Sequence, residues 1–301
     1  MVVQRPCNDC PRRCGVIRPV QAADGPAAGY CRSPLQPVAA RAALHLWEEP
    51  CISGTKGSGA VFFTGCNLRC CFCQNAVISS GSTGIPITVE RLKEIYNELI
   101  DQGAHNINLV TPTPYTQAIL ASLEQPLSVP VVYNCGGYES LETIDAFDGK
   151  IQIYLPDLKY MDSHMAATYS KAADYPQVAT AAILHMYDQI GPYEMGDDGI
   201  LRKGVLIRHL ILPGHLDNTK RVIDWVEDHF LPGQVLFSLM RQYIPCGRAA
   251  EYPEINRPVS DEEYGEAEEY LFSGPIEDGF VQEKESASQG FIPVFDGWGV
   301  R

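Results

Sequence analysis

The sequence of 301 residues has few basic side chains, no long apolar run and no export signal at its start. Its 23 Lys and Arg against 37 Asp and Glu give a net charge of −14, which argues against nucleic acid as a partner, because binding phosphates requires a basic surface. No apolar run approaches the length of a membrane span, so we expect no membrane association. Residues 1–7 lack the apolar segment of a signal peptide, and we therefore expect a cytoplasmic protein.

Cysteine, in contrast, is abundant. In a chain without an export signal, 11 cysteines are expected to bind metal or to stay free, because the cytosol keeps thiols reduced. Residues 59–63 predict a short buried strand that ends at the turn residue Gly65. The chain then presents three cysteines with C-x3-C-x2-C spacing: Cys66, Cys70 and Cys73. Three thiolates can hold three irons of a 4Fe–4S cluster and leave the fourth iron open to a small molecule.

Two alternatives exist for this loop. Close-set cysteines also suit zinc, with a histidine as the fourth ligand. Cys71 could replace Cys70 in the trio, but the aromatic residue Phe72 directly before the last cysteine favours Cys70.

A second cysteine group lies near the N-terminus: Cys7, Cys10, Cys14 and Cys31. Four cysteines in a loop-rich segment are typical of a structural tetrahedral metal site such as zinc, and metal binding would order such a segment. Spacing does not separate zinc from an auxiliary iron–sulfur cluster, and chance clustering of free thiols is a third possibility. Residues 37–47 predict a helix, and Cys51, without a partner in the sequence, is expected to be a buried apolar residue.

From residue 59 onward, apolar strands alternate with amphipathic helices. The strands are expected at 59–63, 106–111, 129–133, 151–155, 205–212 and 235–240. The helices are expected at 88–103, 115–123, 140–147, 163–171, 177–190 and 218–230, with a hairpin at 193–204 and an acidic helix near 261–270. This alternation predicts an α/β fold with parallel strands, either a barrel or a doubly wound sheet, and its six strands suit an incomplete barrel.

Most polar motifs follow the strands directly, at their carboxyl ends. Thr111 and Thr113 come after the second strand, Asn134 after the third, and Asp157 and Lys159 after the fourth. Arg208 lies within the fifth strand. Because parallel α/β folds bind ligands at this edge, the positions predict a single binding site there.

The cysteine loop, with its Cys-x-Phe-Cys-Gln-Asn ending at Asn75, resembles the signature of radical S-adenosylmethionine (SAM) enzymes, especially the branch of pyruvate formate-lyase activating enzyme. This resemblance implies a partial (β/α)6 barrel, a 4Fe–4S cluster and SAM as cofactors, and reduced flavodoxin or ferredoxin as electron donor. It also implies the residues that bind SAM: Phe72, Asn75, Thr111, Thr113, Asn134, Asp157, Lys159 and Arg208. The sequence departs from the family at residues 108–114, which lack the glutamate of a Gly-Gly-Glu-Pro loop, so Thr113 and backbone carbonyls are expected to replace it.

The resemblance implies an enzyme that cleaves SAM reductively, forms a 5′-deoxyadenosyl radical and removes hydrogen from a substrate, such as a glycyl-radical enzyme. Radical modification of a peptide or small metabolite is one alternative, and a non-catalytic zinc-binding module is another. The expected division of the chain is a cysteine-rich metal-binding segment at 1–50, a barrel at 55–245 and a C-terminal tail at 246–301 that covers the barrel mouth.

Overall fold

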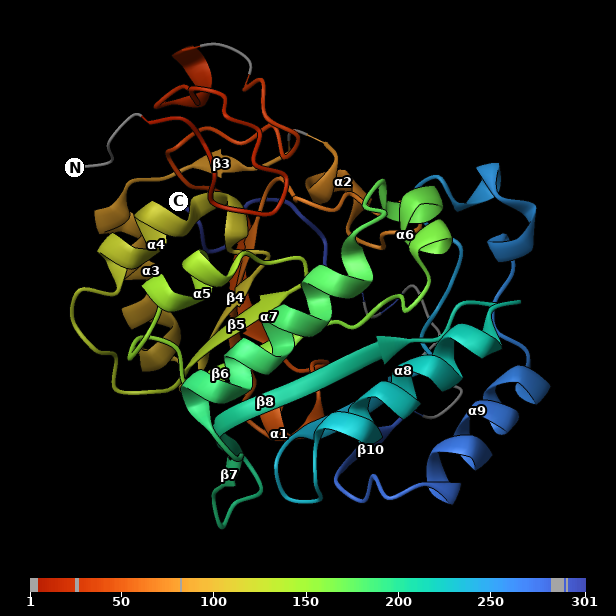
Figure 1. The fold of residues 1–301 in the computed structure, drawn as a ribbon. Helices are drawn as coiled ribbons and strands as arrows, with labels where there is room; N and C mark the ends of the chain where they lie inside the picture. Colours follow the sequence, from red (N-terminus) through yellow and green to blue (C-terminus); the bar gives the residue numbers. More distant parts are fainter. Residues whose placement is uncertain (1–4, 25–26, 82, 283–289, 291) are drawn as a thin grey trace.

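The computed structural model of the chain describes residues 5–24, 27–81, 83–282, 290 and 292–301 (Figure 1). Its strands are β1 (Val38–His45), β2 (Ser58–Phe63), β3 (Ile85–Pro86), β4 (Ile107–Val110), β5 (Val131–Cys135), β6 (Ile153–Pro156), β7 (Glu194–Met195), β8 (Leu201–Leu210), β9 (Leu236–Met240) and β10 (Gly279–Val281). Its helices are α1 (Pro50–Ser53), α2 (Ala76–Ser79), α3 (Val89–Asp101), α4 (Thr116–Ser122), α5 (Leu141–Ala146), α6 (Ser163–Ser170), α7 (Tyr175–Ile190), α8 (Leu216–His229) and α9 (Asp261–Ser273). Four short 3-10 helices are η1 (Ala22–Asp24), η2 (Thr113–Tyr115), η3 (Ala249–Glu251) and η4 (Pro253–Ile255).

One sheet runs through the molecule in the order β10-β9-β8-β6-β5-β4-β2-β1-β3, and β7 pairs with β8 in the hairpin. All neighbours from β2 to β10 along this path are parallel, while β1 and β3 are antiparallel additions. Among the described strands the two ends of the path, β10 and β3, do not pair, so the barrel is incomplete. The predicted parallel barrel is therefore confirmed, and β10 is a parallel strand that the sequence analysis did not identify.

The longer helices lie outside the curved sheet, with α3, α4 and α5 along one half, α7 across the middle and α8 and α9 beside the last strands (Figure 1). Helix α3 shows how local sequence sets its start, because the Thr88 hydroxyl accepts a hydrogen bond from Arg91 N at 3.1 Å. The apolar face of α3 is fully buried against the sheet: Leu92, Ile95, Tyr96 and Leu99. None of the helices that the structure describes is long and apolar enough to cross a membrane.

The lumen of the barrel has its own small core. Cys51 and Ile52 of α1 are buried against inward-facing residues of the parallel strands, including Ile153 and Leu155 of β6. Helix α1 therefore closes one end of the lumen, and Cys51 is the buried apolar residue that the sequence suggested. The opposite end, where the parallel strands finish, stays available for a site.

The helix predicted at 37–47 is wrong, because residues 38–45 form β1. Alanine-rich apolar sequence favours a helix locally, but β1 pairs along its length with β2, from Ala39 opposite Phe63 to His45 opposite Ser58. The other edge of β1 is also bonded, since Ala42 N donates to Trp298 O at 2.8 Å and Gly297 N donates to Ala40 O at 2.9 Å. Pairing on both edges, which depends on distant segments, outweighs local helix propensity here.

Candidate functional site

The cysteine loop leaves the carboxyl end of β2 through a turn that only glycine tolerates. Gly65 has φ of +90°, and a Cβ there would lie 2.1 Å from the Ser33 hydroxyl and 2.8 Å from Cys31 O. Hydrogen bonds within and around the loop then fix two of the thiols. Leu68 N donates to Cys66 Sγ at 3.3 Å, and the Ser170 hydroxyl donates to Cys70 Sγ at 3.0 Å.

Three of the four cysteines in this loop border one cavity at the barrel mouth: Cys66, Cys70 and Cys73. Cys71 is not among the lining residues. It is buried, its N–H donates to Tyr169 O at 2.8 Å, and its carbonyl accepts from Arg248 N at 2.6 Å. The geometry thus separates Cys71 from the trio, in line with the choice that Phe72 indicated.

Two of the three thiols, Cys66 and Cys73, are costly to ionise in this environment unless a cation binds them. Burial, with the nearby Cys70 adding to it, raises the pKa of Cys66 to about 12. Burial and Cys70 also raise the pKa of Cys73. A metal centre offsets such costs, because a coordinating thiol is deprotonated on binding.

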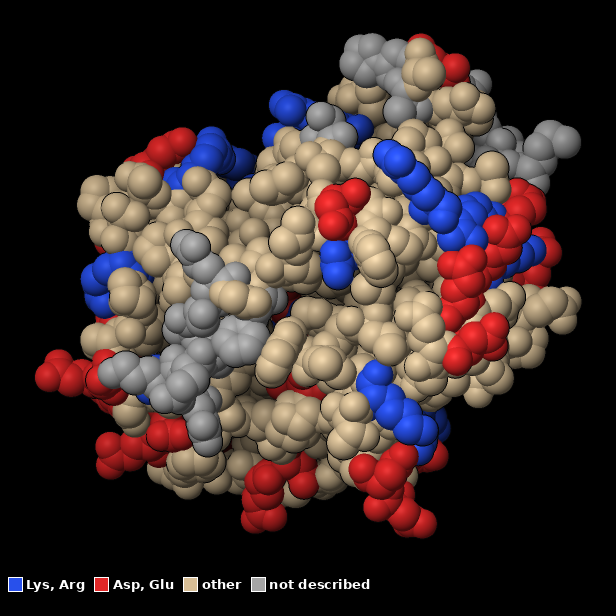
Figure 2. Space-filling view, turned by 180° about the vertical axis from the view of Figure 1, so that it is seen from behind, with Lys and Arg blue, Asp and Glu red and all other residues tan. Residues whose placement is uncertain are grey.

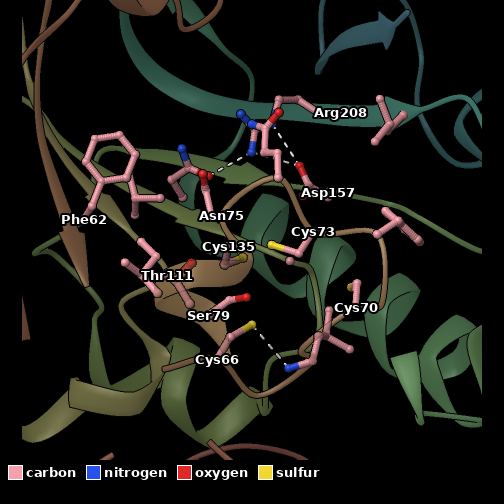
Figure 3. Close-up of a pocket in the computed structure, with 18 of the residues that line it drawn as sticks. Phe62, Cys66, Cys70, Cys73, Asn75, Ser79, Thr111, Cys135, Asp157 and Arg208 are labelled. Carbon is pink, nitrogen blue, oxygen red and sulfur yellow. Dashed lines mark hydrogen bonds and ion pairs between the residues drawn. The ribbon is translucent and has the colours of Figure 1, made fainter. Parts of the chain in front are cut away.

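Polar atoms beside the thiols also fit a bound group. Asn75 Oδ1 is buried with no hydrogen-bond partner among the described residues, and Asn75 lines the cavity. Buried polar atoms are rarely left unpaired, so this oxygen suits a donor from a ligand in the cavity. Ser79, at the end of α2, lies in the same wall (Figure 3).

The wall opposite the cysteines is a buried ion network (Figure 3). Arg208 of β8 donates from Nε to Asp157 Oδ1 at 2.9 Å and from Nη2 to Asn134 Oδ1 at 2.8 Å. Its Nη1 donates to Glu48 Oε1 at 2.6 Å, and Glu48 Oε2 accepts from Asn134 Nδ2 at 2.9 Å. Lys159 Nζ donates to Asp157 Oδ2 at 2.5 Å, which completes a chain of alternating charges.

These charges keep each other ionised despite burial. Burial alone would raise the pKa of Asp157, but Arg208 and Lys159 outweigh it and lower that pKa. Burial would likewise lower the pKa of Lys159, but Asp157 and Cys70 outweigh it and raise that pKa above its usual value. Two cations therefore face the cysteine loop across the cavity, where a ligand carboxylate could pair with them.

The loops after β4 and β5 complete the cavity with unusual backbone. Thr111 lines it with φ of +61°, which is rare for a β-branched residue and typical of strained functional sites. Gly137 has φ of +78°, and a Cβ there would lie 2.3 Å from Asp157 O. The Gly136-Gly137 pair thus allows the β5 loop to pass close to β6, with Cys135 and Gly136 in the wall.

The predicted residues are mostly brought together, with one exception. Ten of them line the cavity: Cys66, Cys70, Cys73, Phe72, Asn75, Thr111, Asn134, Asp157, Lys159 and Arg208. Thr113 does not, because it begins η2 and its buried hydroxyl donates to Glu139 Oε1 at 2.9 Å. The expectation that Thr113 faces the ligand is therefore corrected, since the chain turns into η2 directly after Thr111.

Several lining residues were missed by the sequence analysis, above all Glu48. It lies between β1 and α1, outside the repeating strand–helix units. Because residues 37–47 were predicted as a helix, no pattern in the sequence placed Glu48 at the cavity. Cys135 and Ser79 were also missed, although Cys135 directly follows the predicted Asn134. His209 is a packed residue, as a lone histidine usually is, with its ring nitrogens bonded to Leu158 O at 2.7 Å and the Thr219 hydroxyl at 3.0 Å.

The C-terminal tail contributes only part of its length to the cavity. Pro293 of the tail lines it, together with Tyr243 and Ile244 just before the tail, and Gly247 packs on the cysteine loop, where a Cβ would lie 2.7 Å from Cys71 O. Helix α9 instead packs beside α8, and residues 283–289 and 291 of the tail lie outside the described part of the chain. The molecule is hollowed near the centre of the face drawn in Figure 2, with acidic side chains visible inside the hollow.

The N-terminal cysteines do not line this cavity. Cys7, Cys10, Cys14 and Cys31 are all partly buried free thiols. Within the described residues, no three His, Cys, Asp or Glu side chains stand at the distances of a formed metal site, in this segment or around Cys66.

Comparison with known proteins agrees with this geometry. Residues 53–124, which include the cysteine loop, match the family described as a 4Fe-4S single cluster domain. The uncharacterized protein MJ0674 of Methanocaldococcus jannaschii is 30% identical over 272 residues, a match that covers 87% of this chain and 72% of that protein.

Solved structures of Streptococcus suis SuiB share the fold at 12% identity. SuiB bound to S-adenosylmethionine has a TM-score of 0.52, and the match covers 73% of this chain and 49% of SuiB. SuiB bound to the precursor peptide SuiA has a TM-score of 0.50, with 73% and 47% covered, so this chain spans about half the length of SuiB. The chain thus belongs to the family of the M. jannaschii protein and has the radical SAM fold, with a 4Fe–4S cluster domain that includes Cys66, Cys70 and Cys73.

Proposed function

We propose that this protein is a radical SAM enzyme in which Cys66, Cys70 and Cys73 hold a 4Fe–4S cluster and SAM binds in the adjoining cavity. The observation that carries the proposal is that one loop at the mouth of the parallel barrel brings three of its four cysteines, Cys66, Cys70 and Cys73, to the border of one cavity and leaves Cys71 outside it. A 4Fe–4S cluster normally takes four cysteines, so three thiols leave one iron free for a small molecule. When bound, the cluster and SAM supply the radical chemistry, in which an electron cleaves SAM and hydrogen is removed from the substrate.

The residues of this chain bind SAM and orient it beside the cluster. Arg208 and Lys159 offer two cations to the carboxylate of SAM, and Asp157 holds both of them in place through its two oxygens. The unpaired Asn75 Oδ1 accepts a hydrogen bond from the cofactor, and the strained Thr111 turn presents backbone beside it. Asn134, held by Arg208 and Glu48, places its side-chain amide in the cavity wall.

The rest of the lining excludes water from the reacting groups. Phe62, Val110, Leu210, Met240 and Tyr243 give the cavity an apolar side. Radical intermediates are protected by such a shell, because water and stray hydrogen donors are kept away.

For the finer activity, we propose an activating-enzyme-like reaction on a glycyl-radical enzyme, with reduced flavodoxin or ferredoxin as electron donor. The Cys-x-Phe-Cys-Gln-Asn ending of the loop supports this branch. Radical modification of a peptide is the second candidate, because the chain shares its fold with SuiB, which was solved with a precursor peptide. Mixing the loaded enzyme with a glycyl-radical enzyme under anaerobic conditions tests the first candidate, through the electron paramagnetic resonance signal of a glycyl radical.

The core of the proposal is tested by anaerobic reconstitution with iron and sulfide, followed by reduction with dithionite in the presence of SAM. We expect iron with acid-labile sulfide and release of 5′-deoxyadenosine. Cys70→Ala should abolish that release and lower the iron content by about one cluster. Cys71→Ala is the matched control, because the Cys71 thiol is next to Cys70 in the sequence but lies outside the cavity. This variant should keep both the cluster and the release of 5′-deoxyadenosine.

The opposite pattern, with Cys71→Ala inactive and Cys70→Ala active, would show that the trio is assigned wrongly. Zinc in place of iron, with no 5′-deoxyadenosine from the wild type, would instead support the non-catalytic zinc-binding module.

A further inference from the structure

The N-terminal cysteines are gathered into one place by backbone hydrogen bonds. Cys7 N donates to Val16 O and Gly15 N donates to Cys7 O, both at 2.9 Å, so Cys7 lies beside the segment that follows Cys14. Between them Arg13 N donates to Cys10 O at 3.0 Å and closes a turn that contains Cys10. Cys31 joins from the next turn, because Tyr30 N donates to Cys14 Sγ at 3.5 Å. These bonds therefore bring the four cysteines into neighbouring turns of one short segment.

This segment has almost no apolar core of its own. Of the aliphatic and aromatic side chains whose burial is described between residues 5 and 36, only Pro34 and Leu35, at the end of the segment, are buried, while Ile17 is 56% exposed and Val20 is 40% exposed. So little apolar burial does not offset the entropy of ordering about thirty residues. Small segments of this kind usually gain their order from a metal or from disulfides, and all four cysteines are free.

The charge of the segment also suits a thiolate centre. Residues 1–36 carry five arginines against two aspartates, a net charge of +3 in a chain whose total is −14. Four thiolates around a divalent metal, or around an oxidised iron–sulfur cluster, leave a net negative charge. The arginines offset that charge, in a segment whose sign is opposite to that of the chain as a whole.

One arginine connects the segment to the cysteine loop. Arg12, between Cys10 and Cys14, donates from Nε to Asn67 O at 2.9 Å and from Nη2 to Ser170 O at 2.9 Å. Its guanidinium lies 3.9 Å from the centre of the Tyr30 ring, which is next to Cys31.

The Tyr30 hydroxyl reaches the same loop, since it donates to Leu68 O at 3.2 Å. Asn67 and Leu68 lie between Cys66 and Cys70, and Ser170 donates to the Cys70 thiol. The two cysteine groups are thus joined through two side chains.

We propose that Cys7, Cys10, Cys14 and Cys31 form a second, thiolate-bound metal centre, and that Arg12 and Tyr30 transmit its order to the Cys66–Cys73 loop. Binding requires the four thiols to rotate toward a shared centre and lose their protons to solvent. Its metal is either a zinc ion or an iron–sulfur cluster, since both accept four cysteines. The site does not depend on the proposed function, whereas its effect on the loop rests on that loop being the cluster site.

The existence of the site is tested in the full chain with the variant Cys66→Ala/Cys70→Ala/Cys73→Ala, which removes the first cluster. Zinc, iron and acid-labile sulfide are measured per chain after anaerobic reconstitution with each metal. We expect about one zinc ion, or one cluster with matching sulfide, to remain and to disappear when Cys10→Ala/Cys14→Ala is added. Zinc without sulfide identifies a zinc site, and iron with sulfide identifies a cluster. No retained metal in the triple variant would overturn the proposal, while release of 5′-deoxyadenosine by the wild type would still support the proposed function.

The coupling is tested by hydrogen exchange, which does not require activity. Arg12→Gln removes the guanidinium contacts without changing a cysteine, and the amides of residues 66–73 should then exchange about tenfold faster. Arg13→Gln is the control, because Arg13 forms only an exposed ion pair with Glu142 at 2.8 Å, and exchange should stay at the wild-type rate. Removing the second metal by chelation from the triple variant should have the same effect as Arg12→Gln. Equal exchange in the Arg12 and Arg13 variants would refute the coupling.

Discussion

Replacing Arg208 with methionine tests whether the buried ion network holds the cavity together. Arg208 is largely buried and bonds to three elements, through Asp157 after β6, Asn134 of β5 and Glu48 before α1. Removing one partner of a buried ion pair typically costs about 3–5 kcal/mol, because the remaining charge stays desolvated.

We expect Arg208→Met to lower the free energy of unfolding by about 3 kcal/mol, at the lower end of that range, because the two carboxylates keep other partners. Asp157 retains Lys159, and Glu48 retains Asn134 and Asn108 at 2.9 and 3.1 Å. For a chain of this size the midpoint of thermal unfolding should fall by about 6 °C. Arg208→Lys should recover only part of the loss, because an ammonium cannot reproduce the forked contacts.

The same variant has a defined pH dependence. The pKa of Asp157 is lowered in the folded protein, so Asp157 contributes stability above its unfolded pKa, and that contribution is lost as the pH falls through the folded pKa. Without Arg208, burial raises the pKa of Asp157. Protonation then removes the buried negative charge, and with it the cost of desolvation, at a higher pH than in the wild type. The difference between wild type and variant should therefore be largest at pH 7 and narrow toward pH 4.

Thermal unfolding followed by circular dichroism, under anaerobic conditions from pH 4 to pH 8, measures both effects. Arg202→Met on the same strand is the control, because Arg202 forms only an exposed pair with Asp198 and should change stability by less than about 0.5 kcal/mol. The reasoning fails if Arg208→Met unfolds within about 1 °C of the wild type at pH 7, or if the difference widens in acid.

Two other substitutions test parts of the molecule that support the cysteine loop. Burial raises the pKa of Glu139 to about 8, so the wild type should lose stability as the pH rises from about 5 to 8, by up to about 1.4 kcal/mol per pH unit. Glu139→Gln should remove this loss, so its free energy of unfolding should rise relative to that of the wild type between pH 6 and pH 8, as measured by unfolding titrations. A stability difference that stays constant with pH would contradict the raised pKa of Glu139. Gly247→Ala should cost about 2 kcal/mol, because its φ is +58° and the Cβ would meet Cys71 O at 2.7 Å. Gly233→Ala, also at positive φ but with nothing within 4 Å, should cost less in the same measurement, and equal losses would show that the contact has no effect.

Local patterns in the sequence were sufficient for a parallel α/β fold. Most of the parallel strands from β2 to β9 are short apolar runs followed by helices with an apolar face, and the resemblance of the cysteine loop to radical SAM enzymes then indicated the partial barrel. The site residues at strand ends followed from the same regularity, because the carboxyl ends of parallel strands meet at one edge. Asp157, Lys159 and Arg208 are adjacent in space for that reason.

Residues outside the repeating units could not be found in this way. The strand β1 was taken for a helix, since its pairing with β2 and with residues 297 and 298 is invisible in local sequence. Glu48 was missed with it, although it bonds to Arg208 at 2.6 Å. Thr113 was expected in the cavity, but the first turn of η2 directs its hydroxyl to Glu139.

By itself the sequence determined most of the parallel strands and their helices, the order of these elements and the spacing of the three thiols, because these depend on neighbours within about ten residues. Only the tertiary structure decided which groups meet. It separated Cys71 from Cys70, placed Glu48 opposite the cysteines and joined the N-terminal cysteine segment to the loop through Arg12. Those contacts connect residues far apart in the chain, and their energy depends on how the sheet curves and which backbone groups remain unpaired, neither of which a local pattern contains.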